Sequence, residues 1–155
     1  MSAPRRISRK KKVVVDASVI LKWLLDDEES VPQAIALRDE SLQTSSALVA
    51  PSLWVYEVTN GLVTAAKRDR ISPTDVRLAI DDILLIGIQS RTPPVQRVAS
   101  LAIVHRLAAY DSAYLALAEQ ENCELWTGDY AFYKTMRAKF PWVKWIGDYP
   151  LPKRS

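Results

Sequence analysis

Short apolar runs alternate with longer amphipathic stretches along almost the whole chain. Runs of a few mostly apolar residues, bounded by charged residues or proline, are typical of fully buried strands. We predict strands at residues 12–15, 47–50, 88–92, 124–127 and 142–146. Helices of roughly 10–18 residues are expected between these runs. The pattern therefore predicts an α/β protein in which helices cover both faces of a parallel sheet.

The amphipathic stretches predict helices at residues 19–25, 30–43, 53–70, 73–87, 95–121 and 130–140, with a break near 109–111. Two of the N-termini carry specific signals. Ser52 is placed to cap the helix over 53–70, and Ser72-Pro73-Thr74-Asp75 is a capping box with proline at the first helical position. Neither an internal repeat nor a Pro/Gly-rich linker interrupts the chain after residue 12, so a single domain is expected.

The composition limits the possible classes of protein. The chain has 155 residues, 48% hydrophobic and 25% charged, as expected for one ordinary globular domain. A single cysteine (Cys123) and a single histidine (His105) exclude a disulfide framework and a zinc site rich in Cys or His. No stretch approaches the roughly 20 apolar residues of a membrane span. We therefore expect a cytoplasmic protein without membrane association.

Positive charge is concentrated at the N-terminus. The first twelve residues contain six basic residues and no acid, whereas the rest contains 15 basic and 18 acidic residues, a net charge of −3. The six are Arg5, Arg6, Arg9, Lys10, Lys11 and Lys12. Such a segment is typical of a disordered, solubilising extension, and it can also hold a polyanion through phosphate contacts. We expect a tail over 1–12, one domain over 13–150 and a C-terminal tail over 151–155.

Three aspartates lie where a parallel sheet binds its ligands. Asp16 directly follows the first predicted strand, Asp129 follows the fourth, and Asp111 follows the break in the long helical stretch. In such sheets, ligands bind outside the carboxyl ends of the strands, where the strand order switches. Each aspartate also precedes a predicted helix, where Asp is a favoured N-cap. The two roles are compatible, because a capping carboxylate can still present an oxygen outward.

Glu57 is a fourth candidate, and helix capping does not explain it. It lies in the second turn of the helix predicted over 53–70, past the N-cap. Helical spacing places it on the face that carries Asn60 and Gly61, away from the apolar stripe of Trp54, Val58 and Leu62. We interpret that face as a partly buried polar seam. The alternative is an ordinary exposed helical glutamate.

The four carboxylates together favour a divalent metal ion. Carboxylates a few ångströms apart repel one another and raise each other's pKa, so gathering them at one sheet edge is unfavourable without a cation. Because none of the four candidate ligands is Cys or His, the ligand set is all oxygen, which favours Mg²⁺ or Mn²⁺ over zinc. A cation in such a site can activate a water and neutralise charge on a phosphoryl oxygen, as in phosphodiester hydrolysis.

Four segments, in this order, resemble the PIN-domain family and, within it, the ribonuclease toxins of VapBC toxin–antitoxin systems. They are VVVDASVI (13–20), PSLWVYEVTN (51–60), YDSAYLALA (110–118) and LWTGD (125–129). The resemblance runs from about Val13 to Gly147. It implies a Rossmann-like, three-layer α/β/α sandwich with a parallel sheet and an acidic pocket that binds Mg²⁺ or Mn²⁺. It also implies an endoribonuclease that prefers single strands.

The resemblance also implies roles for individual residues and partners. The acidic quartet would consist of Asp16, Glu57, Asp111 and Asp129. Ser18 and Thr127 match hydroxyl positions that steady the acidic cluster, and Asn60 matches a polar position beside it. A small VapB-type antitoxin is implied as the inhibitor. We further expect a homodimer or a higher assembly, and we regard the six basic residues of the tail as candidate RNA contacts.

Two other functions stay open beside a metal-dependent endoribonuclease. A binding module that has lost catalysis would carry the same fold, and a metal-dependent phosphatase would also use an acidic pocket. A phosphatase of the haloacid-dehalogenase type requires a second Asp two residues after the first, where this chain has Ser18. A phosphoacceptor receiver domain requires adjacent acids after its first strand and a Lys after its last, and neither is found. The sequence therefore favours the ribonuclease.

Overall fold

The structure, a computed structural model, describes residues 11–153. The strands are β1 (Lys12–Val15), β2 (Ala47–Pro51), β3 (Gln89–Arg91), β4 (Glu124–Thr127) and β5 (Val143–Trp145). The helices are α1 (Ala17–Leu24), α2 (Val31–Gln43), α3 (Trp54–Lys67), α4 (Pro73–Leu85), α5 (Val95–His105), α6 (Ala109–Glu121) and α7 (Tyr130–Met136), followed by a short 3₁₀ helix, η1 (Ile146–Asp148). Every predicted strand and helix is present, and only their ends differ.

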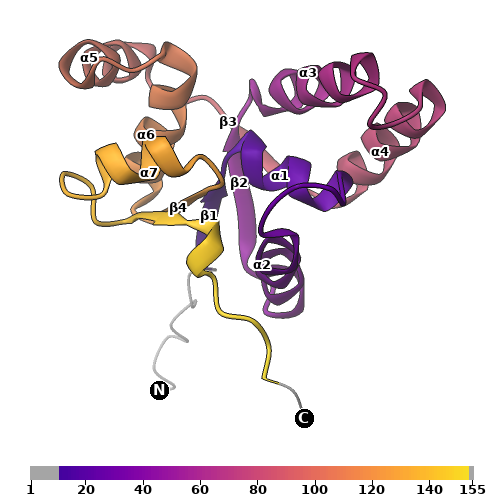
Figure 1. Cartoon of the computed structure of the whole chain (residues 1–155). Coiled ribbons are helices and arrows are strands. Elements are labelled where there is room, and N and C mark those ends of the chain that lie inside the picture. The colour runs from indigo at the N-terminus through magenta and orange to yellow at the C-terminus, as the bar shows by residue number, and fades with distance from the viewer. Residues whose placement is uncertain (1–10, 154–155) are drawn as a thin grey trace, which may run out of the picture.

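The strands form one parallel sheet in the order β3-β2-β1-β4-β5. The chain builds β1, β2 and β3 outward in one direction and then returns to place β4 and β5 on the other side of β1. The strand order therefore switches between β1 and β4. Helices α1 to α4 lie on one side of the sheet and α5, α6 and α7 on the other (Figure 1). The predicted three-layer α/β/α sandwich is confirmed.

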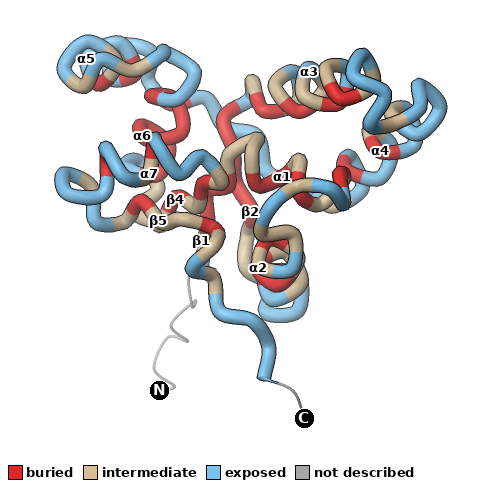
Figure 2. The backbone as a smooth tube through the Cα atoms, in the orientation of Figure 1, coloured by how far each residue is buried: buried red, intermediate tan, exposed pale blue. Residues whose placement is uncertain are grey.

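The core lies along the central strands and under α6. Val14, Val15 and Leu125 are fully buried because helices cover both faces of the sheet. Helix α6 is buried over residues 112–118 since it lies between the sheet and α5, and a helix in such a place lacks a polar face. Figure 2 shows this burial as red along most of β1 and through α6, whereas buried and half-buried residues alternate along β4. Within residues 11–153, no helix is both long and apolar enough to cross a bilayer.

The two predicted N-cap signals have different outcomes. Ser72 caps α4 as predicted, since its hydroxyl accepts from the N–H of Asp75 at 3.1 Å. Ser52 does not cap α3: the N-cap residue is Leu53, which makes no side-chain capping bond. The Ser52 hydroxyl instead bonds the hydroxyl of Thr92 at 3.1 Å, just beyond β3. A contact with a neighbouring strand thus overrides the local capping preference.

Candidate active site

Asp16 and Asp129 lie at the two neighbouring strands between which the strand order switches. The N–H of Asp16, directly after β1, donates to the carbonyl of Trp126 in β4 at 3.2 Å. Asp129 lies two residues beyond the end of β4. Both carboxylates cap the next helix, Asp16 by accepting from Val19 N–H at 3.2 Å and Asp129 from Phe132 N–H at 3.0 Å. The predicted capping role of these two aspartates is confirmed.

Two hydroxyl groups join the turns that carry these aspartates. The Ser18 hydroxyl donates to the Asp16 carboxylate and accepts from the N–H of Gly128 at 2.7 Å. Thr127 is fully buried, and its hydroxyl accepts from the N–H of Asp129 at 3.0 Å. The nearby Thr127 hydroxyl also lowers the pKa of the Asp16 carboxyl. This network fixes the orientation of Asp16 relative to the turn that follows β4.

Glu57 and Asp111 come from helices on opposite sides of the sheet. Glu57 lies in the first turn of α3, not the second, and its Oε1 accepts from the hydroxyl of Tyr114 at 2.6 Å. Tyr114 is buried on α6, one turn after Asp111. The N-cap of α6 is Ala108, without a side-chain capping bond, so the predicted capping role of Asp111 is wrong. The reason is that the helix break lies at 106–108, which places Asp111 inside the first turn of α6.

The carboxylates influence one another in pairs. Burial is the main cause that raises the pKa of Asp16 to about 6, and partial burial of the carboxyl group raises the pKa of Glu57 and of Asp111. Repulsion adds to each: the charge of Asp129 raises the pKa of Asp16 and of Asp111, and the charge of Asp111 raises that of Glu57. All four acids are therefore electrostatically coupled at the carboxyl edge of the sheet.

The chemistry of this edge fits a hard divalent cation. Its ligand atoms are carboxylate oxygens, and none of the four acids takes part in an ion pair between residues of the described range, 11–153. Within that same range, no group of three His, Cys, Asp or Glu side chains is arranged so that it could hold a metal ion as it stands. The donor set suits Mg²⁺ or Mn²⁺, and the side chains would have to draw closer to bind one.

The remaining predicted site residues that the structure describes take no part in these hydrogen bonds. Asn60 is exposed on α3, one turn after Glu57. Lys11 is exposed, and Lys12 belongs to β1, where its amine pairs with Glu121 at 2.7 Å at the amino end of the sheet. Lys12 is therefore not part of a free tail, because a strand and an ion pair hold it. The other basic residues of the tail lie outside the described residues: Arg5, Arg6, Arg9 and Lys10.

No role was predicted for Tyr114 from the sequence, although its side chain links the two sides of the site. Its phenol holds Glu57, and burial, that hydrogen bond and the charges of Glu57 and Asp16 raise its pKa far above the ordinary value. The signal in the sequence was the spacing of one helical turn between Asp111 and Tyr114. That spacing places both side chains on the same face of α6, but it does not identify the partner of either.

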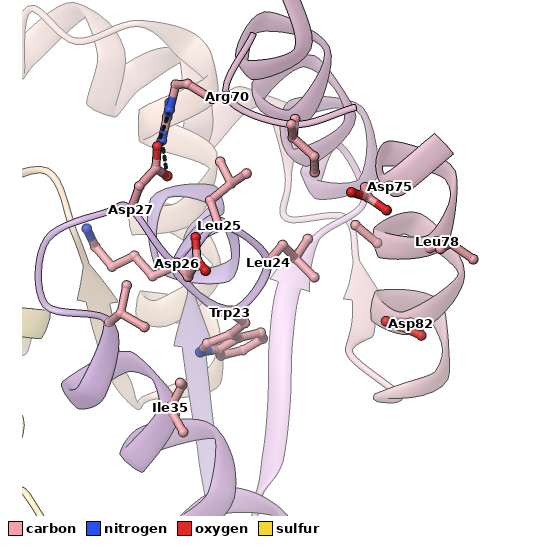
Figure 3. Close-up of a pocket in the computed structure, with 14 residues that line it drawn as sticks. Trp23, Leu24, Leu25, Asp26, Asp27, Ile35, Arg70, Asp75, Leu78 and Asp82 are labelled. Atoms are coloured by element: carbon pink, nitrogen blue, oxygen red, sulfur yellow. Dashed lines mark hydrogen bonds and ion pairs between the residues drawn. The ribbon is translucent and has the colours of Figure 1, made fainter. Parts of the chain in front are cut away.

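A separate cavity of about 440 Å³ lies between α1, α2 and α4 (Figure 3). Its wall includes Trp23 and Ile35, and the ion pair between Asp27 and Arg70 lies at one side, with two bonds of 2.8 Å. The cavity lies at the C-terminal end of α1, whereas Asp16 caps the N-terminus of that helix. None of the four acids of the acidic edge lines it.

The raised pKa of Asp16 predicts that the stability of the metal-free protein depends on pH. Its pKa is 3.8 in an ordinary environment and about 6 in the folded chain. Between these values the folded state binds more protons than the unfolded state, so the free energy of unfolding falls as pH rises through this window and levels off above it. The loss is at most about 3 kcal/mol from this group, and Glu57 and Asp111 act in the same direction.

Thermal unfolding in the presence of a chelator, followed from about pH 4 to about pH 7, measures this dependence. Asp16→Asn removes the titrating group and is expected to flatten the curve, while the exposed Asp81→Asn on α4 leaves it unchanged. An Asp16→Asn protein with the full pH dependence of the original chain would show that the Asp16 carboxyl is not its source.

Comparison with known proteins agrees with this geometry. Residues 13–137 match the PIN domain family. Ribonuclease VapC9 of Mycobacterium tuberculosis is 34% identical over 130 residues, which cover 83% of this chain and 94% of the relative. Ribonuclease VapC3 of Pyrobaculum aerophilum is 28% identical over 134 residues, covering 84% and 95%. The crystal structure of PAE2754 from Pyrobaculum aerophilum shares the fold, with a TM-score of 0.67 and 21% identity over 89% of this chain and 92% of that one. The chain belongs to the PIN-domain family, in the group of the VapC ribonucleases.

Proposed function

We propose that the chain is an endoribonuclease that hydrolyses phosphodiester bonds in single-stranded or structured RNA, and that it is the toxin of a type II toxin–antitoxin pair. The observation that carries the proposal is the coupled acidic edge at the switch point of a PIN-family sheet. Relatives named as ribonucleases match this chain along nearly their whole length, which supports the same activity. Neither a phosphatase nor an inactive binding module is favoured by any contact in the described residues.

We propose further that the enzyme depends on Mg²⁺ or Mn²⁺ held by Asp16, Asp111 and Asp129, with Glu57 as a further ligand or as a group that orients water. When bound, such an ion activates water and neutralises charge on the phosphoryl oxygen. The chain supplies the orientation: Ser18 and the start of α1 fix the Asp16 carboxylate. Asp111 and Asp129 are exposed, so they are open to an approaching phosphodiester.

The test is to incubate the purified chain with labelled RNA and Mg²⁺ or Mn²⁺ and to map the products. Internal cleavage is the expected result. Release of inorganic phosphate from a monoester, without cleavage of RNA, would instead indicate a phosphatase. A chain that binds an antitoxin and never cleaves RNA with Mn²⁺ present would indicate an inactive binding module.

The partners follow from the same proposal. A VapB-type antitoxin is expected to bind and inhibit the chain in the cytoplasm, where its RNA substrate is found. The relatives named VapC support this partner. Co-expression with the product of a small open reading frame directly upstream, followed by purification of one tagged chain, tests whether the two associate.

We also propose that the protein is a homodimer or a higher assembly. Large apolar side chains are exposed on α3, α4 and α5, including Tyr56, Leu85 and Ile103, which are 80%, 84% and 79% exposed. A contact between copies of the chain would remove such side chains from water. Light scattering is expected to give at least twice the mass of one chain, and a monomer at micromolar concentration would contradict the proposal.

The basic tail remains a predicted RNA contact. The truncation that tests it removes residues 2–10 and retains Lys12, because Lys12 is paired in β1. Loss of positive charge is expected to weaken RNA binding at low salt more than at high salt, since the contacts are with phosphates. Binding measured across a series of salt concentrations checks this. Equal loss at all of them, or no loss, would leave the tail without an electrostatic role.

A further inference from the structure

Lys22 is unusual because it is a buried lysine without a counter-charge. Among residues 11–153 the buried polar or charged residues are Lys22, Ser41, Ser112 and Thr127, and the lysine is 8% exposed. Lysine is almost never buried unless it is paired. The ion pairs between described residues do not include Lys22. Asp27, which lines the same cavity, is bound by Arg70 instead (Figure 3).

The stem of Lys22 lies against the turn that carries Asp129. On α1, Lys22 is one turn after Ser18, and both side chains meet Gly128. A Cβ atom at Gly128 would lie 2.7 Å from Lys22 Cε and 3.0 Å from Ser18 Oγ, so a larger residue there would displace the end of the lysine stem. The amine is one bond beyond Cε. It is therefore beside the β4–α7 turn, next to the network that orients Asp16 and Asp129.

The amine is available to a ligand. Lys22 Nζ is absent from the fully buried polar atoms without a partner, which in the described residues are Gln33 Oε1, His105 Nδ1 and Ser112 Oγ. Lys22 also makes no side-chain hydrogen bond or ion pair with another described residue, so Nζ keeps some exposure to solvent, while the aliphatic stem packs against the turn at Gly128. A lysine held in this way loses less conformational freedom on binding than an exposed one.

We propose that Lys22 binds a phosphate of the RNA substrate beside the acidic edge. This proposal rests on the proposed ribonuclease function. RNA that approaches four carboxylates is repelled, and a cation next to them would offset part of that repulsion. An ammonium group is a compact charge with three donors, which suits a phosphate oxygen. Since no carboxylate pairs with Lys22 in the described range, its charge is free for this contact.

The experiment compares Lys22→Met, which keeps the length of the stem and removes the charge, with Lys67→Met at an exposed position of α3. Binding of a fully 2′-O-methylated oligonucleotide is measured without divalent metal over a range of salt concentrations. Lys22→Met is expected to weaken binding about tenfold and to reduce the slope of log K against log salt by about 0.7, the value for one phosphate contact to a single strand. Lys67→Met should change neither.

Measurements of RNA cleavage and of thermal stability distinguish a phosphate contact of Lys22 from a purely structural role. With cleavable RNA, Lys22→Met is expected to lower kcat/KM by at least the loss in binding. Its melting temperature is not expected to fall, because methionine keeps the packed aliphatic stem and removes only the charged end, which pairs with no acid in residues 11–153. If Lys22→Met fails to fold, Lys22→Gln replaces it with the same expectations. Unchanged affinity and salt slope, whether or not stability changes, would overturn the proposal. Absence of cleavage by the original chain would instead refute the ribonuclease function and leave the binding result to stand alone.

Discussion

Asp16→Asn is expected to abolish RNA cleavage while the fold remains intact. Asparagine is as good an N-cap as aspartate, so its side-chain oxygen can still accept from Val19 N–H. The substitution also removes the burial penalty of the Asp16 charge and its repulsion with Asp129. What is lost is the negatively charged oxygen that a divalent ion requires. Since loss of groups that merely orient metal ligands costs 10- to 100-fold, we expect a loss of at least about 100-fold here.

A cleavage assay with labelled RNA, together with a melting curve, measures both parts of this prediction. Asp81→Asn is the matched control, because it makes the same change of charge at an exposed position of α4. The control is expected to cleave at the original rate. An Asp16→Asn protein that cleaves RNA as fast as the original chain would exclude Asp16 from the chemistry.

Removal of divalent metal is expected to stop cleavage completely, and Mg²⁺ or Mn²⁺ is expected to restore it. The four acids lack a protein counter-charge in the described residues, so their charge is suited to a cation from solution. Because burial raises the pKa of Asp16 to about 6, protons compete with the ion below that pH, and more metal should be needed there. Titration of activity with Mn²⁺ at two pH values, after treatment with a chelator, measures both effects. Full activity in excess chelator would contradict metal dependence.

The fold could be predicted from sequence because its signals are local. Buried strands such as Lys12–Val15 are short, nearly continuous apolar runs. Asp16 and Asp129 each lie between the end of a strand and the start of a helix. Asp111 was misplaced relative to its helix because the break depends on Arg106, whose backbone adopts a left-handed conformation at φ 54°. No feature of the sequence predicts a left-handed backbone at position 106, where the residue is not glycine.

Contacts within the site were beyond the reach of local patterns. The hydroxyl of Tyr114 meets Glu57 across 57 positions of sequence, and Ser18 meets Gly128 across 110. A buried lysine cannot be recognised from its neighbours in the chain, since the apolar positions around Lys22 are those of an ordinary amphipathic helix. The sequence thus predicts which acids reach the edge of the sheet, whereas only the packing of helices shows what holds them.

The most direct test of the central claim is a crystal structure of the chain soaked with Mn²⁺, with the ion located by its anomalous scattering. An ion among the carboxylates of Asp16, Asp111 and Asp129, close to Glu57, is the predicted result. A structure at saturating Mn²⁺ in which these carboxylates hold no ion, or in which manganese binds only elsewhere, would contradict it.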